Sequence, residues 1–308
     1  MGLHRDEVPD SYQDKYILSS YRPAGITATQ SVLSIFQWHN ETFNFWTHFL
    51  VFAYFAWKCF NLDLPLFEEP YYWPVLCVGI GSCLYPLLSS VAHAFSSMDI
   101  KVRHFVFYLD YMGISVYSCT TSMAFLTYTA PEHVRNSQMA YIYTYTCVVL
   151  IVMSFIGCCL SRHYSNANRA VILRVAAFAV PFLFVCVLML HWLLYHKSSP
   201  IDHHYSHILW NPAVGLVAAV RLPERLVPHS FDVIGQSHQL FHITAFIASK
   251  YQFDAVIRDC FFKRGTINAD IASRLSVEAF LLVLSIDFAI LCYFTMRLRN
   301  SNDKIKNK

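Results

Sequence analysis

Two histidines stand four residues apart inside the apolar stretch FDVIGQSHQLFHITAFIAS, which runs from Phe231 to Ser249. On a helix, His238 and His242 project from one face, with Cβ atoms about 5–6 Å apart. That spacing lets both imidazoles reach one ion at the zinc–nitrogen distance of about 2.0–2.1 Å. The same pair also suits two histidines that are hydrogen-bonded inside a helical bundle. Alone, the pair leaves a metal site and a structural role open.

Further polar residues favour the metal. The stretch SSVAHAFSSM carries Ser89 and His93 four residues apart, and Asp110 follows in the next apolar stretch, RHFVFYLDYMGIS. Three imidazoles from two helices, with a fourth position left open, are typical of catalytic zinc, which activates water for attack on carbonyl groups. We therefore expect Zn²⁺ to be held by His93, His238 and His242.

Two residues beside the expected ligands are candidates for catalytic roles. Asp110 could orient a ligand histidine or act as the general base, since Gln239 stands where a metalloprotease H-E-x-x-H motif has its glutamate. The alternative for Asp110 is an ordinary hydrogen bond between helices. Ser89 lies one turn before His93 on the same face, and it either contacts the site or bonds back to its own helix.

Other polar residues are assigned structural roles. We expect Glu41 and Asn44 to cap and anchor the first long helix at the membrane surface, and His48 to be structural. His203, His204 and His207 are interpreted as interfacial histidines rather than as a second metal site. Asp287 needs a partner inside the bundle, and structural pairing is the favoured reading.

The elements that must position these side chains are membrane helices. The chain has 308 residues, of which 56% are hydrophobic and only 14% charged, whereas soluble domains carry about 25% charged residues. A helix needs about 20 apolar residues to cross a bilayer. Eight stretches approach this length: Thr42–Leu62, Tyr72–Phe95, Phe105–Leu126, Met139–Leu160, Ala170–Tyr195, Ile208–Val220, Phe231–Ser249 and Leu275–Met296. The prediction is an all-α polytopic membrane bundle with a seven-helix core and an eighth transmembrane helix.

Charge predicts the orientation. With eight crossings, most of the 23 lysines and arginines fall on the side of the two termini, and the cytosolic flanks of membrane helices collect these residues. We expect a cytosolic segment 1–40, a bundle 41–297 and a basic cytosolic tail 298–308. In this arrangement Ser89, His93, Asp110, His238 and His242 share the cytosolic leaflet. At 1.5 Å per residue, Asp110 and His238 would lie roughly 10 Å into their spans.

Several motifs resemble a known family. YRPAG, ETFNFWTH, SSVAHAFSSM, FYLDY and LPERLVPHSFDVIGQSHQLFH, in this order along nearly the whole chain, are similar to the progestin and adipoQ receptor family, and most to its membrane progestin receptor branch of the gamma type. The resemblance implies an intramembrane zinc on His93, His238 and His242, with Asp110 and Ser89 at the positions of the family's aspartate and serine. It also implies rapid signalling in response to progesterone-like steroids, through G proteins, at the plasma membrane.

Two functions from different classes follow. The first is a steroid receptor, whose helices bind an apolar ligand and signal. The second is a zinc-dependent hydrolase of lipid amides such as ceramide, a ceramidase-like activity to which the residue chemistry points more directly. A zinc-stabilised scaffold without turnover is a third reading. The expected partners are a steroid or other lipid and the membrane, with no nucleic acid.

Overall fold

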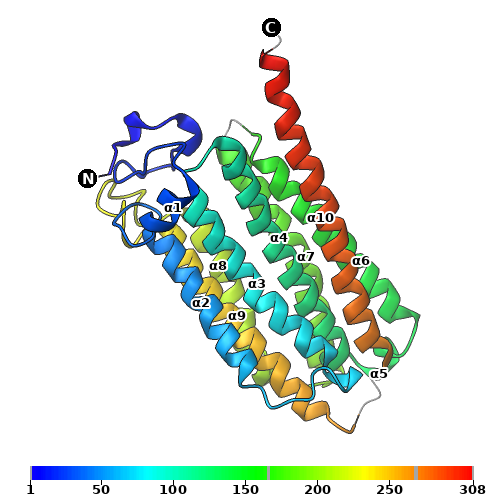
Figure 1. The fold of residues 1–308 in the computed structure, drawn as a ribbon. Helices are drawn as coiled ribbons and strands as arrows, with labels where there is room; N and C mark the ends of the chain where they lie inside the picture. The colour runs from blue at the N-terminus through cyan, green and yellow to red at the C-terminus, as the bar shows by residue number, and fades with distance from the viewer. Residues whose placement is uncertain (1, 165–166, 267–269, 307–308) are drawn as a thin grey trace.

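A computed structural model of the chain describes residues 2–164, 167–266 and 270–306. Within these residues the protein is helical and contains no strand, only a single bridge between Leu3 and Tyr21. Eight helices are long: α2 Thr42–Phe60, α3 Trp73–Phe95, α4 Ile100–Ala124, α6 Gln138–Ser161, α7 Ala167–Tyr195, α8 Tyr205–Val220, α9 Ser237–Lys263 and α10 Asp270–Lys306. They form one elongated bundle (Figure 1). The predicted all-α bundle of seven helices plus an eighth is confirmed.

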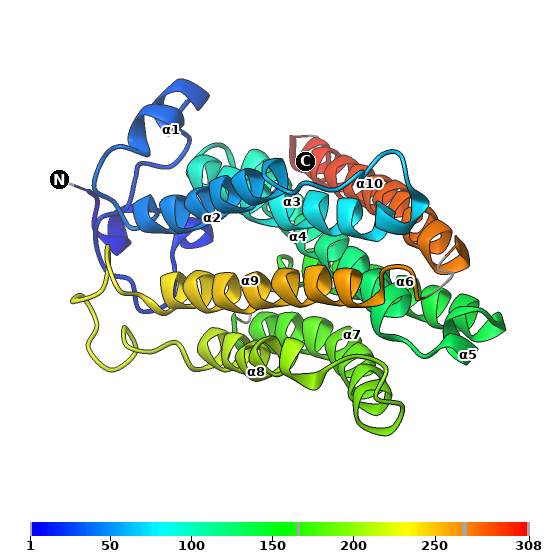
Figure 2. The same ribbon diagram turned by 90° about the horizontal axis from the view of Figure 1, so that it is seen from below.

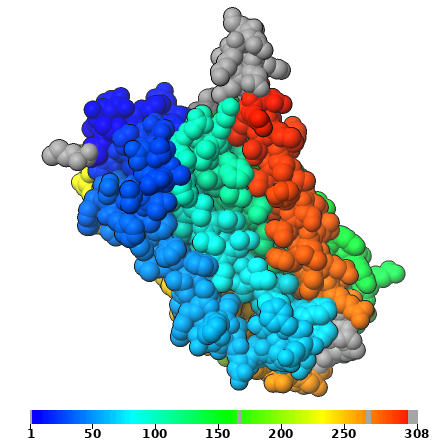
Figure 3. Space-filling model, viewed as in Figure 1, coloured from blue at the N-terminus to red at the C-terminus, as the bar shows by residue number. Residues whose placement is uncertain are grey.

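Helix α9 occupies a central position. It packs against α2 and α3 on one side and against α8 on the other (Figure 2). Helix α10 lies on the outside of the bundle, against α3, α4 and α6. On one face of the molecule, α2 and α10 form opposite edges and α3 is visible between them (Figure 3). The N-terminal segment and the last turns of α10 lie at the same end of the bundle (Figure 1).

In the described part of the chain, four helices are long and apolar enough to span a membrane by length and composition alone: Pro70–Phe95, Gln138–Ser161, Arg169–Tyr195 and Ile271–Asn300. The other long helices are shorter or carry more polar residues, and two of the charged residues on α9, Lys250 and Asp254, are paired. Asp254 forms ion pairs with Lys58 of α2 and, at 3.1 Å, with Lys250 of its own helix. Pairing of this kind lowers the cost of placing charges near hydrocarbon.

The seventh predicted span is placed wrongly along the chain. Helix α9 begins at Ser237 rather than Phe231 and continues to Lys263 rather than ending at Ser249. Gly235, with a φ of 85°, turns the chain just before the helix. The carboxylate of Glu224 then accepts hydrogen bonds from the backbone N–H of Ser237, at 2.7 Å, and from its hydroxyl. Consequently His238 lies in the first turn of α9, not two turns into it.

Two glycines bring α3 and α4 close together. A Cβ on Gly113 of α4 would lie 2.9 Å from the Cα of Tyr85 on α3, and a Cβ on Gly81 would lie 2.5 Å from the hydroxyl of Thr120. Small residues permit this backbone approach, which is a common device in membrane helices. The contact sets the distance between the helix that carries His93 and the helix that carries Asp110.

The segment before α2 is folded against the end of the bundle, where it includes the short helix α1, Ala28–Ser34. Val8, Ile17 and Tyr21 form a small buried cluster there. The segment is tied to the loop before α9, because Asp232 accepts hydrogen bonds from the backbone of Leu18 and the hydroxyl of Ser19. At the other terminus, α10 continues through residues 298–306 of the predicted tail, and residues 307–308 lie outside the described part.

Candidate metal centre

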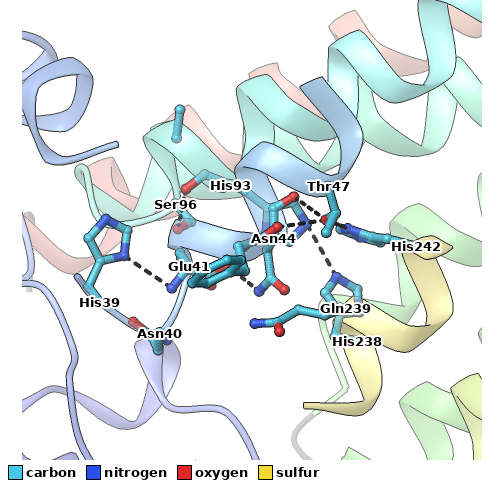
Figure 4. Close-up of polar contacts among 12 residues, drawn as sticks. His39, Asn40, Glu41, Asn44, Thr47, His93, Ser96, His238, Gln239 and His242 are labelled. Carbon is cyan, nitrogen blue, oxygen red and sulfur yellow. Dashed lines mark hydrogen bonds and ion pairs between the residues drawn. The ribbon is translucent and has the colours of Figure 1, made fainter. Parts of the chain in front are cut away.

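Three imidazoles converge at the end of the bundle that carries the N-terminal segment (Figure 4). His93 lies in the last turn of α3, and His238 and His242 lie one above the other at the start of α9. One ring nitrogen of each lies within 4.8 Å of the others. The Nε2 atoms of His93 and His238 are 3.2 Å apart.

A carboxylate fixes the protonation of His93. Glu41, at the start of α2, places Oε2 2.7 Å from Nδ1 of His93, and Asn44 donates to the same oxygen at 2.7 Å. Because the carboxylate only accepts hydrogen bonds, Nδ1 of His93 carries the proton and Nε2 keeps its lone pair. This Glu–His arrangement is typical of metal-binding histidines.

A hydroxyl does the same for His242. The single proton of Thr47 is used on the backbone carbonyl of Phe43, at 2.6 Å, so its oxygen accepts from Nδ1 of His242 at 2.9 Å. Nε2 of His242 is thereby left with its lone pair. Two of the three imidazoles are thus held in the tautomer that a metal needs.

These residues fit a zinc ion. Two nitrogens at about 2.0–2.1 Å from a tetrahedral centre are about 3.3 Å apart, and the separation of the His93 and His238 Nε2 atoms is 3.2 Å. Three neutral imidazoles are ordinary zinc ligands, and each of the three side chains offers one nitrogen within 4.8 Å of the other two. The donor set suits zinc better than calcium or magnesium, which prefer oxygen ligands.

The centre is closed on one side and open on the other. His93 is 3% exposed and His242 is 1% exposed, whereas the ring of His238 is exposed. His48 of α2 covers the buried side of the centre, because its ring stacks on that of His242 with the two centroids 3.5 Å apart. Both ring nitrogens of His48 are buried without a hydrogen-bond partner. The exposed side of the three imidazoles is therefore the side of His238.

An arginine from the N-terminal segment positions His93. The guanidinium of Arg22 donates at 2.7 Å to the backbone carbonyls of His93 and Ala94, and at 2.9 Å to the hydroxyls of Ser34 and Ser96. These carbonyls belong to the last turn of α3, where helical partners are missing and a positive charge is favourable. Arg22 is buried, so the contact is shielded from water.

The starts of α2 and α9 are joined in the same way. The side-chain amide of Gln236, at the N-cap of α9, donates to the backbone carbonyl of Asn40 at 2.9 Å. Asn40 precedes Glu41, and Gln236 precedes the two histidines by two and six positions. The helix that provides the carboxylate and the helix that provides two imidazoles are therefore held in register.

The two residues predicted to assist a metal have no described contact with the three histidines. Ser89 of α3 lies within interaction distance of the carboxyl of Asp110 on α4. Among the described hydrogen bonds, none joins Ser89 or Asp110 to the three histidines. Their roles at the metal stay predictions.

Two assignments made from the sequence, those of Glu41 and Asn44 as capping residues, were wrong, whereas His48 was expected to be structural. Glu41 stands at the N-cap of α2, but its side chain makes no capping bond and binds His93 instead. Asn44 supports Glu41, and His48 packs on His242. A signal was available, because positions 41, 44 and 48 recur at the helical period and place three polar side chains on one face of α2.

The histidines at the opposite end form no second metal site among the described residues. His203 and His204 each bind the buried carboxylate of Asp259 on α9 at 2.8 Å, and His204 contacts His207 at 3.1 Å. His204 and His207 are fully buried, so the expectation of exposed interfacial histidines was wrong for these two. Thr129 and Ser199 also donate to Asp259, which makes this cluster a hydrogen-bonded joint between helices.

Comparison with known proteins agrees with the motifs. A family model described as haemolysin-III related matches residues 36–253. Membrane progestin receptor gamma-B of Danio rerio is 33% identical over 96% of this chain and 94% of its own length. Membrane progestin receptor delta of Mus musculus is 37% identical over 83% of this chain and 78% of its own. Membrane progestin receptor gamma of Homo sapiens is 33% identical over 82% of this chain and 80% of its own length. The chain belongs to the haemolysin-III-related family, the progestin and adipoQ receptor family that its motifs resemble.

Proposed function

We propose that the protein is a membrane receptor for a progestin-like steroid that signals rapidly without acting on genes directly. The observation that carries this proposal is the match to relatives named membrane progestin receptors, which extends over 96% of the chain for gamma-B of Danio rerio. The apolar bundle supports it, since a steroid partitions into the membrane and reaches helices sideways. Signalling through G proteins at the plasma membrane, with the N-terminus in the cytosol, is part of the proposal.

The proposal includes Zn²⁺ held by His93, His238 and His242. Glu41 and Thr47 would keep the first and last of these imidazoles in the metal-binding tautomer. A bound Zn²⁺ supplies Lewis acidity, which polarises a carbonyl oxygen. Steroids of this class carry a carbonyl, so the open side at His238 suits a ligand that presents one.

A zinc-dependent lipid amidohydrolase is the second candidate, and a specific observation favours it. Ser89 and Asp110 face each other beside the three imidazoles, and the centre is open on one side at His238. Asp110 would act as the general base, taking a proton from the attacking water, and would later protonate the amine that leaves. A ceramide-like lipid would enter sideways from the bilayer.

One set of measurements on the purified protein separates the candidates. Metal content, progesterone binding and ceramide hydrolysis are compared for wild type, His238→Ala and the control His191→Ala, an exposed histidine outside the centre. A receptor binds steroid with full zinc occupancy and no hydrolysis, whereas an enzyme loses hydrolysis together with zinc. A wild-type preparation that contains no zinc would remove the metal from both proposals.

Asp110→Asn separates the enzyme from the receptor further. We expect this variant to keep most of its zinc, since Asp110 makes no described contact with the histidines. Any turnover should fall at least a hundredfold, the usual contribution of general acid–base catalysis. Unchanged turnover would show that Asp110 is not the base.

A further inference from the structure

A cavity of about 600 Å³ opens between the N-terminal segment, the first turns of α7 and the end of α8. Its volume falls within the range of about 300–1,000 Å³ that is usual for small-molecule sites. The cavity does not include any residue of the three-histidine centre. Neither of the proposed functions uses it.

The two sides of this cavity differ in chemistry. One wall is apolar and consists mainly of Val171, Val175 and Ala219, from α7 and α8. The charged residues of the lining are all cationic: Lys15, Arg221 and Arg225. A cavity with one apolar wall and a positively charged rim is complementary to an amphiphile with an anionic headgroup.

Nearby carboxylates among the described residues form no ion pair with the two arginines of this rim. Glu224 stands between the two arginines in sequence, but its carboxylate is turned inward and caps Ser237 of α9. No ion pair of the described residues includes Arg221 or Arg225. Asp14 and Glu224 act on Arg221 only from beyond ion-pair distance. The positive charge of the two arginines therefore remains available to a ligand.

The backbone holds the two arginines together. Arg221 is the C-cap of α8 and has a φ of 55°, a left-handed conformation that costs a non-glycine residue free energy. The backbone N–H of Arg225 binds the carbonyl of Arg221 at 3.3 Å, which forms a turn. Both side chains consequently border the same cavity.

The apolar wall continues into the surface that faces lipid. Only 11% of the most apolar stretch of α7 is buried inside the protein, and Ile172, at the cavity, is 68% exposed. Helix α7 therefore offers a surface on which an acyl chain can lie while its head reaches the arginines. Basic residues at a membrane surface attract anionic lipids in this way.

We propose that this cavity binds an anionic phospholipid of the leaflet on the side of the N-terminal segment. The phosphate and any headgroup carboxylate would contact Lys15, Arg221 and Arg225, and the first part of one acyl chain would lie against Val171, Val175 and Ala219. The bound lipid would join the N-terminal segment to α7 and α8.

The test compares lipids on the whole purified protein. Native mass spectrometry and thermal unfolding are followed with phosphatidylserine, with phosphatidylcholine and with inorganic phosphate at equal ionic strength. We expect phosphatidylserine to bind and to raise the Tm more than phosphatidylcholine, and phosphate alone to have no effect. If inorganic phosphate reproduces the shift, the site binds a free anion and the lipid proposal is wrong.

Variants locate the effect. Arg221→Gln/Arg225→Gln should weaken the preference for phosphatidylserine roughly 30-fold. Arg221→Lys/Arg225→Lys keeps both charges, so it should keep most of the preference and serves to show that the fold tolerates substitution at these positions. The charge-matched control Arg258→Gln/Lys263→Gln, on the last turns of α9, should behave as wild type. Val175→Trp fills the apolar wall and should also abolish the preference. An unchanged preference in the glutamine or the tryptophan variant would overturn the proposal.

Discussion

The Oε2 atom of Glu41 lies 2.7 Å from Nδ1 of His93, and both side chains are buried. The contact joins the start of α2 to the last turn of α3, so residues of two helices together fix the protonation of one imidazole. A neutral partner could accept the same hydrogen bond but would not make the imidazole as basic.

Glu41→Gln should therefore weaken zinc binding by about 10- to 100-fold, the usual effect of losing a carboxylate behind a ligand histidine. Metal affinity is measured by competition with a chelator of known strength. Glu68→Gln, an exposed glutamate before α3, is the control and should bind zinc as wild type does. Equal affinity in the two variants would show that Glu41 does not support the metal.

Acid should destabilise the protein through His39. Burial, together with the charge of Arg22, lowers the pKa of His39 to about 4. Its Nδ1 accepts from the N–H of Glu41 at 3.1 Å, so Nε2–H donates to the carbonyl of Ser34 at 3.0 Å. A second proton on the ring would have to bind Nδ1, where it would point at the N–H of Glu41 and replace that hydrogen bond with a repulsive contact.

Because the folded-state pKa is below the unfolded value of about 6.5, this stability is complete above pH 6.5 and is lost as the pH falls towards 4. The loss reaches about 3 kcal/mol, at 1.36 kcal/mol per unit. His39→Asn should have a lower Tm at pH 7 but a smaller fall in Tm between pH 6.5 and 5. The control His191→Asn should follow wild type, and a parallel fall in His39→Asn would contradict the assignment.

The close approach of α3 and α4 predicts opposite effects for two glycine substitutions. Gly113→Ala places a Cβ 2.9 Å from the Cα of Tyr85, which should cost about 1–3 kcal/mol of unfolding free energy. Gly215→Ala on α8 meets nothing within 4 Å and should be neutral or stabilise the helix by up to about 1 kcal/mol. Thermal unfolding in detergent compares the two, and a neutral Gly113→Ala would mean that the helices separate at little cost.

Asp259→Asn tests the joint at the opposite end of the bundle. The carboxylate accepts from Thr129, Ser199, His203 and His204 while buried, and an amide replaces one of its acceptor oxygens with a donor. We expect a loss of about 2–4 kcal/mol in unfolding free energy, with zinc content unchanged because the cluster is far along α9 from His242. Asp63→Asn, at an exposed loop position, should have no effect.

The fold was largely predictable because hydrocarbon length constrains membrane helices strongly. The exception was α9, whose second half carries Lys250, Asp254 and Arg258. Charges at this density indicate a loop when they are read alone. Their compensation is tertiary, since Asp254 binds Lys58 of another helix, and no local pattern reports it.

The three histidines were predictable for a related reason, since imidazoles four apart in an apolar stretch have few alternatives. The supporting residues were not. Thr47 and Arg22 are ordinary polar residues by sequence, and their partners lie 195 and 71 positions away. Which of the available caps or contacts such a residue makes depends on how the helices pack.

The hydrogen bonds of Arg22 to the last turn of α3 couple the polar N-terminal segment to the interior of the bundle. A protein that binds or displaces this segment at the membrane surface would therefore act on the backbone carbonyl of His93, which Arg22 holds. A binding event outside the lipid can in this way affect the three histidines without any helix sliding along its neighbour.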